Sequence, residues 1–422
     1  MSNWPTVPLS ELTTKIGSGA TPRGGKGAYK ERGIPLIRSM NVYDLVFNRD
    51  GIAYLDDQQA AGLDNVVVQD GDVLLNITGA SVARCCAAPS FMAGARVNQH
   101  VAIIRPITSK LDGRFLAYKL ASEPNKSRLL NLASAGATRE ALTKGGLERY
   151  QVECPPLETQ RRIASILGAY DDLIEVNRRR IAVLEEMARG LFEEWFVRFR
   201  FPGHEAVPIL DTPDGPVPEG WSVRTIGDVG DVVTGKTPSK AVPEFFGGEV
   251  PFVKIPDLHL SFFVHNTGET LSEGGAASQS SKTVPGGALC VSCIGTIGLV
   301  AITVAPCQTN QQINTLIPPN QEWTEFLYFS LVRAKRHLIN LGANGATIGN
   351  VNKKKFSGVR VSCPTSALLH AFHKRAAPMF ALIRNVEYAN HGLALSRDLL
   401  LPRLISGQLS VAEAERELEE AA

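Results

Sequence analysis

The chain has 422 residues, 44% of them hydrophobic and 20% charged, a composition that excludes wholesale disorder and leaves room for more than one core. The formal charge is +2, but the last ten residues hold five Glu and one Arg, so the rest of the chain carries +6 and leans mildly toward polyanionic partners. The seven Cys suggest no disulfide framework and the first residues show no secretory signal, so we expect a protein of the reducing cytoplasm.

In chain order, the first part of the sequence contains short Val/Ile-rich runs bounded by Gly, Pro, Asn and Asp, which predict strands, and a helical stretch from Phe115 to Leu132. After Pro155-Pro156 we expect one long helix from Glu158 to Phe199, which would be on the order of 60 Å long. The Pro/Gly-rich stretch from Phe201 to Gly220 reads as a linker. More strand-like runs follow it, with a helical stretch from Phe326 to Leu341.

An uncharged stretch from Thr283 to Gln321 is long enough to suggest a membrane span. Gly295 and Gly298 interrupt it, however, and it is rich in Val, Ile and Thr. These features favour two buried strands joined by a Gly-containing turn over a membrane helix. We therefore expect no membrane partner.

The second half of the chain repeats the first. Seven pairs of segments match in the same order, at offsets that fall from 217 to 209 residues, so the chain is two tandem copies of a unit of about 210 residues. The matching pairs are Trp4 and Trp221; Gly19-Ala20-Thr21-Pro22 and Gly235-Lys236-Thr237-Pro238; the runs beginning at Ile34 and Val250; the runs beginning at Asp70 and Gly286; Asn98-Gln99 and Asn310-Gln311; the Gly-Ala-Thr loops at 136–138 and 345–347; and Cys154-Pro155 and Cys363-Pro364.

The long helix carries a heptad seam, in which apolar residues recur at alternating spacings of three and four. Its positions are Leu167, Tyr170, Ile174, Asn177, Ile181, Leu184, Ala188, Leu191 and Trp195, and the offset places a weaker seam at Ala376, Met379, Ile383, Val386, Asn390, Leu393, Arg397, Leu400 and Leu404. Arg397 is out of place on such a seam, and Pro378 and Pro402 are expected to kink or end the second helix. Asn177 is either tolerated polarity or a buried amide that fixes the register of the pairing.

These features resemble the specificity subunit of type I restriction–modification systems. The resemblance rests on the order of globular unit and long helix, the recurring Gly-x-Thr-Pro, the Gly-Ala-Thr loop, the run Pro-Pro-Leu-Glu-Thr-Gln-Arg-Arg-Ile at 155–163, and the terminal Leu404-Ile405-Ser406-Gly407. The second copy departs from it, since Pro364-Thr365-Ser366-Ala367 replaces the Pro-Pro-Leu-Glu-Thr-Gln run.

The resemblance implies an α+β protein with two tandem α/β target recognition domains, each followed by a long helix, the two helices pairing as an antiparallel coiled coil. It implies recognition domains at 1–155 and 220–364, spacer helices at 156–200 and 365–422 with an acidic tail, and a linker at 201–219. Each domain would read one half of a bipartite double-stranded DNA site. The partners would be two methyltransferase subunits and restriction/translocase subunits, and this chain would have no catalytic activity of its own.

Other chemistry has weaker support. The run Gly230 to Thr237 matches the phosphate-binding pattern G-x-x-x-x-G-K-[ST], which would suggest a nucleotide hydrolase, but Pro238 and Pro243 disfavour the helix that such a loop requires. Cys290-x-x-Cys293 lacks a second such pair for zinc, and the first copy has apolar residues there, so we expect buried thiols and no metal. No methyltransferase tetrapeptide or dinucleotide fingerprint occurs, and no cofactor is expected.

Candidate DNA contacts are polar and cationic loop residues that recur in both copies. Arg, Asn and Gln suit base edges and Lys suits phosphates, whereas the alternatives are solvated charges and turn caps. The candidates in the first copy are Arg23, Lys26, Lys30, Arg38, Asn98, Gln99, Thr138, Arg139 and Lys144, and those in the second are Lys236, Lys240, Lys254, Asn310, Gln311, Thr347, Asn350, Asn352, Lys353 and Lys354.

Two features of the first helix leave alternatives open. Arg161-Arg162 and Arg178-Arg179-Arg180 are either a solvated face or a docking site for a partner. The aromatic group Phe192, Trp195, Phe196 and Phe199 is either core or an interface with a methyltransferase subunit. A protein-binding repeat scaffold is a further alternative to DNA recognition.

Overall fold

The computed structural model describes residues 4–22, 24–134, 141–213, 215–259, 261–343 and 349–421, except for the side chains of Lys26, Leu418 and Ala421. The chain forms two compact units: the first unit contains Met1–Ile174 and Leu393–Ala422, and the second unit contains Glu175–Gly392. These units cut both long helices, so they are not the segments predicted from the sequence, whose limits remain a proposal.

The first unit is built on an antiparallel sheet in the order β2-β10-β7-β8 (Thr13–Ser18, Val101–Pro106, Val73–Asn76 and Cys85–Ala87). Every residue of β7 is buried because helices α3 (Gly113–Ala121) and α4 (Glu123–Ser134) and a second sheet cover it. The remaining elements are the sheet β6-β3-β9 (Ala53–Leu55, Ile34–Ile37, Arg96–Val97), the pairs β1-β11 (Thr6–Pro8, Gln151–Glu153) and β4-β5 (Val42–Tyr43, Val46–Phe47), and helices α1 (Leu9–Leu12), α2 (Asp57–Ala61), α5 (Lys144–Glu148) and α13 (Val411–Ala421).

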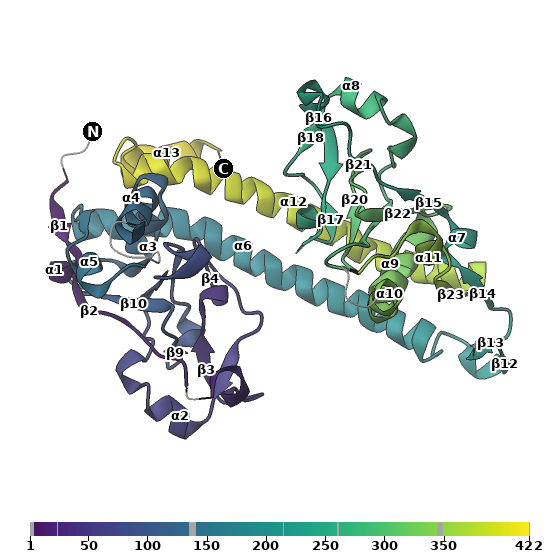
Figure 1. Cartoon of the computed structure of the whole chain (residues 1–422), viewed down its shortest axis with the longest axis horizontal. Coiled ribbons are helices and arrows are strands. Elements are labelled where there is room, and N and C mark those ends of the chain that lie inside the picture. The colour runs from purple at the N-terminus through teal and green to yellow at the C-terminus, as the bar shows by residue number, and fades with distance from the viewer. Residues whose placement is uncertain are drawn as a thin grey trace. The chain divides into compact units, whose positions relative to one another are not determined.

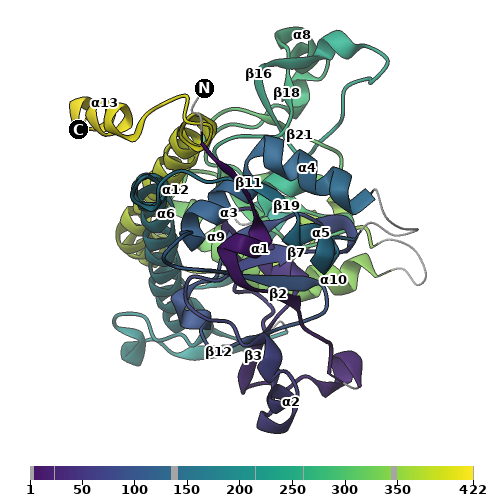
Figure 2. The ribbon, with the colours of Figure 1, turned by 90° about the vertical axis from the view of Figure 1, so that its left-hand side faces the viewer.

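The second unit repeats this plan. Its main sheet has the order β15-β22-β19-β20-β17 (Asp231–Thr234, Ile313–Ile317, Leu289–Ser292, Val300–Thr303, Phe263–Val264). The sheet β18-β16-β21 (Thr270–Leu271, Phe246–Val253, Gln308–Thr309) lies with α8 (Glu273–Ala277) in both views (Figures 1 and 2). Also present are the pairs β14-β23 (Ser222–Thr225, Arg360–Cys363) and β12-β13 (Ile209–Thr212, Gly215–Pro218), and helices α7 (Ile226–Val229), α9 (Thr324–Arg333), α10 (Lys335–Gly342) and α11 (Lys353–Ser357).

The strand pairings confirm the internal repeat. In the first unit, β3 pairs antiparallel with β6 and parallel with β9, and in the second unit β16 pairs in the same two ways with β18 and β21. The mixed α+β class predicted from the sequence is also confirmed. The segment predicted as a linker is not wholly irregular, since it holds the β12-β13 hairpin.

The uncharged stretch from Thr283 to Gln321 forms strands, as predicted. β19 and β20 pair antiparallel with every residue buried, and Gly295 and Gly298 between them both have positive φ, where a side chain would be strained. No helix in the described ranges has the length and hydropathy needed to span a membrane.

The long helices are α6 (Leu157–Phe192), which continues as a π-helical segment (Glu193–Val197), and α12 (Ser366–Ile405). All the seam positions predicted on both helices are buried or half-buried. The expectation that proline would end the second helix is wrong, because α12 runs unbroken through Pro378 and Pro402. Both prolines are exposed, where water can satisfy the carbonyl groups that lose a backbone partner.

Arg397 is accommodated on the seam because it pairs with a carboxylate. In the first unit its guanidinium forms an ion pair with Asp171 of α6, and both side chains are largely buried. A charge on an apolar seam is tolerated when it is paired in this way. Burial lowers the Arg397 pKa, but the hydrogen bonds and charges of Asp171 and Asp398 more than offset this, so the pKa lies above its usual range and the charge persists.

Asn177 is a buried amide in the second unit, 6% exposed, and its Nδ2 donates to Oδ1 of Asn390 at 2.8 Å. Both residues lie on the predicted seams, although the offset between the copies pairs Asn177 with Val386 and Ile181 with Asn390. This hydrogen bond favours the interpretation that Asn177 specifies register over simple tolerance of a polar residue.

We expect Asn177→Leu alone to lower the free energy of unfolding by about 1–3 kcal/mol, because it leaves the Asn390 amide without its partner. The double substitution Asn177→Leu with Asn390→Leu should recover most of that loss, since neither amide is then left unpaired. A double-mutant cycle measured by urea unfolding checks this. Additive losses would show that the two amides are not coupled.

The aromatic residues at the end of α6 are core rather than free surface. Phe192, Trp195 and Phe196 are buried in the second unit, and their rings contact Phe372 of α12 at centroid distances of 6.3, 6.1 and 4.8 Å. Phe199 is half-buried and meets the ring of Trp221 edge-on at 5.4 Å. The core interpretation is therefore confirmed for the first three.

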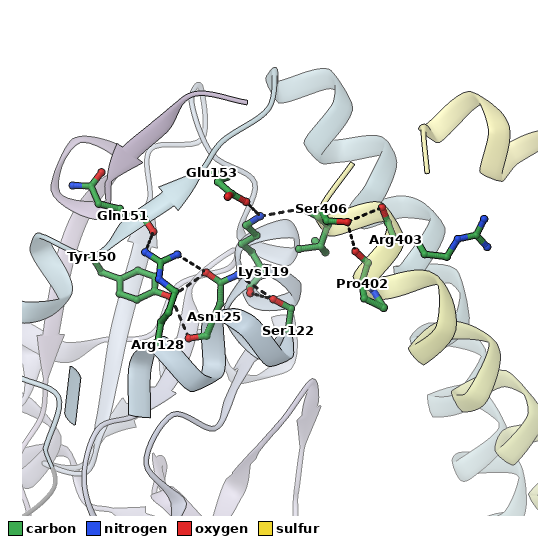
Figure 3. A network of polar contacts seen from close by, with 11 residues as sticks. Lys119, Ser122, Asn125, Arg128, Tyr150, Gln151, Glu153, Pro402, Arg403 and Ser406 are labelled. Atoms are coloured by element: carbon green, nitrogen blue, oxygen red, sulfur yellow. Dashed lines mark hydrogen bonds and ion pairs between the residues drawn. The ribbon is translucent and has the colours of Figure 1, made fainter. Parts of the chain in front are cut away.

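The end of α12 is held in the first unit by a buried lysine (Figure 3). Lys119 of α3 is 2% exposed, and its Nζ donates to the carbonyl oxygen of Ile405, the last residue of α12, at 3.0 Å and to Glu153 at 2.7 Å. A cation at a helix C-terminus satisfies a free carbonyl and complements the helix dipole. Leu404, Leu409 and the acidic helix α13 pack in the same core, and Arg162 of α6 pairs with Glu415.

Candidate nucleic-acid interface

In both units the Gly-x-Thr-Pro segment leaves the edge strand of the main sheet and crosses the chain just before the Asn-Gln pair. The amide of Gly19 donates to the carbonyl oxygen of Asn98 at 3.1 Å. A Cβ at Gly19 would lie 1.6 Å from the carbonyl oxygen of Val97, and one at Gly235 would lie 2.2 Å from that of Asn310. Glycine is therefore required by close backbone approach at the same place in each copy.

The asparagine of each Asn-Gln pair connects this crossing to the second sheet. Asn98 and Asn310 are buried, and their backbone amides donate to the carbonyl oxygens of Ile37 at 3.1 Å and Val253 at 3.0 Å. Each side-chain oxygen accepts from the backbone amide two residues later, as in an Asx turn. The structure thus gives both asparagines a turn-forming role, and their contact with DNA stays a prediction.

Arg38 and Lys254 immediately follow Ile37 and Val253, so they lie beside the asparagines. Their backbone amides donate to Asn41 Oδ1 at 3.0 Å and to Asp257 Oδ2 at 2.7 Å, which caps equivalent 3-10 turns. The guanidinium of Arg38 donates to the Gly51 carbonyl and lies 5.4 Å from the Tyr29 ring. The ammonium of Lys254 forms an ion pair with Glu269. Each cation therefore already has one partner within the protein.

The glutamine of each pair is exposed and is held by the threonine of the Gly-x-Thr-Pro segment. The hydroxyl of Thr237 donates to Oε1 of Gln311 at 2.6 Å, and the hydroxyl of Thr21 makes the same bond to Gln99. These threonines are not among the contacts predicted from the sequence. The recurrence of Gly-x-Thr-Pro in both copies was the signal that could have identified them.

His100 and Thr78 were also missed. Oγ1 of Thr78 lies 2.5 Å from Nδ1 of His100, whose Nε2 lies 3.0 Å from Nε2 of Gln99. Thr78 forms an isolated antiparallel β-bridge with Ala141, which follows the Gly-Ala-Thr loop in sequence. In the second unit, Ile294 forms the equivalent β-bridge with Asn350. No repeat signal pointed to His100, because the second copy has Gln312 at that position.

The remaining predicted contacts fall into three groups: residues that have a partner or capping role in the protein, exposed residues, and residues outside the described ranges. Lys30 pairs at 3.3 Å with Asp56, the N-cap of α2, and Lys144 pairs at 3.7 Å with Glu148, while Asn352 caps α11. Exposed residues with no role assigned by the structure are Lys236, Lys240, Asn350, Lys353 and Lys354. The predicted contacts Arg23, Thr138, Arg139 and Thr347, and the side chain of Lys26, lie outside the described residues.

The phosphate-loop alternative has no support from the fold. β15 (Asp231–Thr234) occupies half of the Gly230–Thr237 pattern, and the next helical element is a three-residue 3-10 turn that begins at Pro243. Such a loop must lead directly into a helix whose N-terminal amides face the phosphates. The run therefore does not form a nucleotide site.

All seven cysteines are buried and free, which confirms the prediction for Cys290 and Cys293. Desolvation raises the pKa of Cys290 to about 12 and the pKa of Cys293 to about 11. In the described parts of the chain, no group of three or more His, Cys, Asp or Glu side chains is arranged to hold a metal ion.

We expect the folded protein to react very slowly with a thiol reagent at pH 8, because the thiolate is the reactive form and burial suppresses it. All seven thiols should react in denaturant. A time course of colour release with an aromatic disulfide reagent, with and without guanidinium, measures this. Rapid reaction of a thiol in the native protein would contradict the buried arrangement.

Comparison with known proteins identifies the family. The model of the type I restriction modification DNA specificity domain matches residues 1–186 and 218–367. The chain is 29% identical to the type I restriction enzyme HindI specificity subunit of Haemophilus influenzae, over 97% of this chain and 100% of that protein. It is 25% identical to the MjaIX specificity subunit of Methanocaldococcus jannaschii, over 70% of this chain and 69% of that protein.

A solved structure has the same fold. The crystal structure of the S subunit of a type I restriction–modification system from M. genitalium superimposes with a TM-score of 0.58 and 14% identity, covering 95% of this chain and 96% of that chain. Because the family model matches most of the chain in two separate stretches, one for each copy of the repeat, this protein is a member of the type I restriction–modification specificity subunit family.

Proposed function

We propose that this chain reads a bipartite, asymmetric site on double-stranded DNA, one half with each copy of the repeat. The observation that carries the proposal is the recurrence of one constellation in both units: Gly-x-Thr-Pro crosses Asn-Gln, with a cation at the end of the neighbouring strand. Reading two half-sites requires two such surfaces on one molecule. The loop residues predicted from the sequence would contact the DNA, with arginine and amide side chains on bases and lysines on phosphates.

The recognition domains, at 1–155 and 220–364, are tied to the long helices within each unit. In the first unit, Arg114 donates to Asp172 of α6 at 3.0 Å. In the second unit, the Glu387 carboxylate of α12 accepts from the backbone amides of Phe262 and Phe263 at 2.8 and 3.0 Å. Contacts of this kind would hold a reading surface at a fixed place on the helix.

The helices at 156–200 and 365–422 would pair as an antiparallel coiled coil that sets the spacing between the half-sites. Contacts inside each unit support this pairing, since Asp171 meets Arg397 in the first and Asn177 meets Asn390 in the second. As residue numbers rise along α6 they fall along α12, which is the order that antiparallel helices require.

Partner subunits would supply the catalysis. The chain would dock two methyltransferase subunits and restriction/translocase subunits, as the family resemblance implies. Exposed apolar residues on the long helices suit a helical partner: Val176, Val183 and Met187 on α6 in the second unit, and Leu395 and Leu399 on α12 in the first. Their spacings of seven and four place each set on one side of its helix.

The test is selection of bound duplexes from a random pool by the chain assembled with its methyltransferase subunits. We expect two short specified halves separated by unspecified base pairs. Replacing residues 1–155 with those of another family member should change one half and leave the other intact. Selection of a single contiguous site, or of no sequence, would overturn the proposal, and a change in both halves would show that the units do not read independently.

A further inference from the structure

We infer that Thr21 and Thr237 are positioning residues that orient the carboxamides of Gln99 and Gln311, so that each amide NH2 group faces outward to donate to a hydrogen-bond acceptor on DNA. The inference rests on the proposed function and assigns a chemistry to one contact in each half-site. Its basis is one side-chain hydrogen bond that occurs at the same place in both units. Thr21 and Thr237 are 216 residues apart in the sequence, and Gln99 and Gln311 are 212 residues apart.

A glutamine side chain has an acceptor end and a donor end, and a half-turn of its carboxamide exchanges them. An exposed glutamine samples both orientations. In each unit the threonine hydroxyl donates to Oε1, which occupies the acceptor end on the protein side. In the first unit Nε2 of Gln99 also lies 3.0 Å from Nε2 of His100, which leaves one of its two N–H groups for a ligand. In the described part of the second unit, Nε2 of Gln311 has no protein partner.

The threonine can act in this way because its own segment is held rigidly. The Lys236 amide donates to the Thr309 carbonyl at 2.9 Å, and the Lys236 carbonyl accepts from Nε2 of Gln279 at 2.7 Å. Gln279 and Gln308 are buried and bonded to each other at 2.9 Å. Pro238 then fixes the backbone immediately after the threonine. The hydroxyl is therefore presented from a fixed point.

The surroundings favour an acceptor as the ligand. Lys236 is exposed next to Thr237, and Arg38 lies beside the Asn98-Gln99 turn in the first unit. A group of hydrogen-bond donors around an outward NH2 can bind a phosphate oxygen or the N7 and O6 acceptors of guanine. It cannot bind the amino group of cytosine, which is itself a donor. A glutamine that uses both ends on adenine would instead have to offer the second lone pair of this oxygen to the adenine amino group.

The experiment compares Thr237→Val with Thr237→Ser in the complex with the methyltransferase subunits. Valine keeps the shape and removes the hydroxyl, whereas serine keeps the donor. On the site selected by the wild-type complex, we expect Thr237→Val to weaken binding about tenfold, the equivalent of one hydrogen bond, and Thr237→Ser to bind within about twofold of wild type. The loss should concern the second half-site, and Thr21→Val should affect the other half.

Modified duplexes distinguish the two acceptor sources. If the acceptor is a base, Thr237→Val reduces discrimination at one base pair, and 7-deazapurine at that position abolishes the difference between Thr237→Val and wild type. If it is a phosphate, the loss is uniform across sequences, the salt dependence stays the same because no charge is removed, and a methylphosphonate at one position abolishes the difference. Gln311→Glu, which loses the donor, should bind more weakly than wild type in both cases.

The inference is overturned if Thr237→Val binds like wild type, if Gln311→Glu binds like wild type, or if Thr237→Ser fails as severely as Thr237→Val while all three keep the wild-type unfolding midpoint. A wild-type complex that selects no bipartite site would instead overturn the proposed function, so the two failures are distinguishable. Equal losses at both half-sites would also contradict a local positioning role.

Discussion

Phe372→Ala is expected to lower the free energy of unfolding of the second unit by about 3–5 kcal/mol. Phe372 is 0% exposed and projects from α12 into the aromatic group at the end of α6. Its ring meets Phe196 nearly perpendicularly at 4.8 Å and lies 6.1 Å from Trp195. Truncation would remove the transfer energy of a large side chain, leave a cavity, and delete edge-to-face ring contacts.

Leu382→Ala on the same helix is the matched control. Leu382 is 49% exposed, so its truncation should change the free energy of unfolding by less than about 0.5 kcal/mol. Urea unfolding followed by tryptophan fluorescence reports on this unit, because it contains Trp195, Trp221 and Trp323. If Phe372→Ala were as mild as the control, the aromatic group would not be a core, and the alternative interpretation of an interface awaiting a partner would regain support.

The periodic and repeated features were predictable from sequence. The offsets between copies located equivalent strands, since strand pairings in the two units match. Alternating spacings of three and four located the helix face that is covered, including the weak seam on α12. Both signals are local or collinear, so they survive without knowledge of the tertiary structure.

Contacts between segments distant in sequence were not predictable in the same way. Nothing in the sequence near Lys119 indicates that its ammonium caps a helix that ends at Ile405. The unbroken course of α12 through Pro378 was missed because proline propensity is local, whereas packing along a 40-residue helix is not. Arg397 is out of place on an apolar seam when its own helix is considered alone, because its partner Asp171 lies on the other long helix.

The candidate site was predicted in part. Residues that recur in both copies came together, because the same fold brings the same segments into contact twice. Some of them also have the capping roles that were the alternative to DNA contact: Asn98 and Asn310 form turns, and Asn352 caps a helix, while their contact with DNA stays a prediction. Thr21 and Thr237 were not predictable from side-chain type, because the hydroxyl acts on a glutamine that is distant in sequence.

Gly19→Ala is expected to weaken binding at the first half-site on the order of a hundredfold while leaving the second half-site unchanged. A Cβ at Gly19 would lie 1.6 Å from the Val97 carbonyl oxygen, a backbone atom that cannot rotate away. The crossing would have to open, which separates Thr21 from Gln99 and shifts the Asn98 turn. Loss of two or three contacts worth about 1–3 kcal/mol each accounts for that magnitude.

Gly27→Ala in the same loop is the control, since a Cβ there meets no atom within 4 Å and φ is not positive. It should bind like wild type, and Gly235→Ala should reproduce the Gly19→Ala defect at the opposite half-site. Binding of each complex to duplexes with one half-site scrambled measures both effects.

The result separates close approach from chain flexibility as the reason for glycine: if flexibility were needed, both Gly19→Ala and Gly27→Ala would lose binding. If neither variant lost binding, the Gly-x-Thr-Pro crossing would not belong to the DNA-reading surface, and the shared constellation would be a feature of the fold alone.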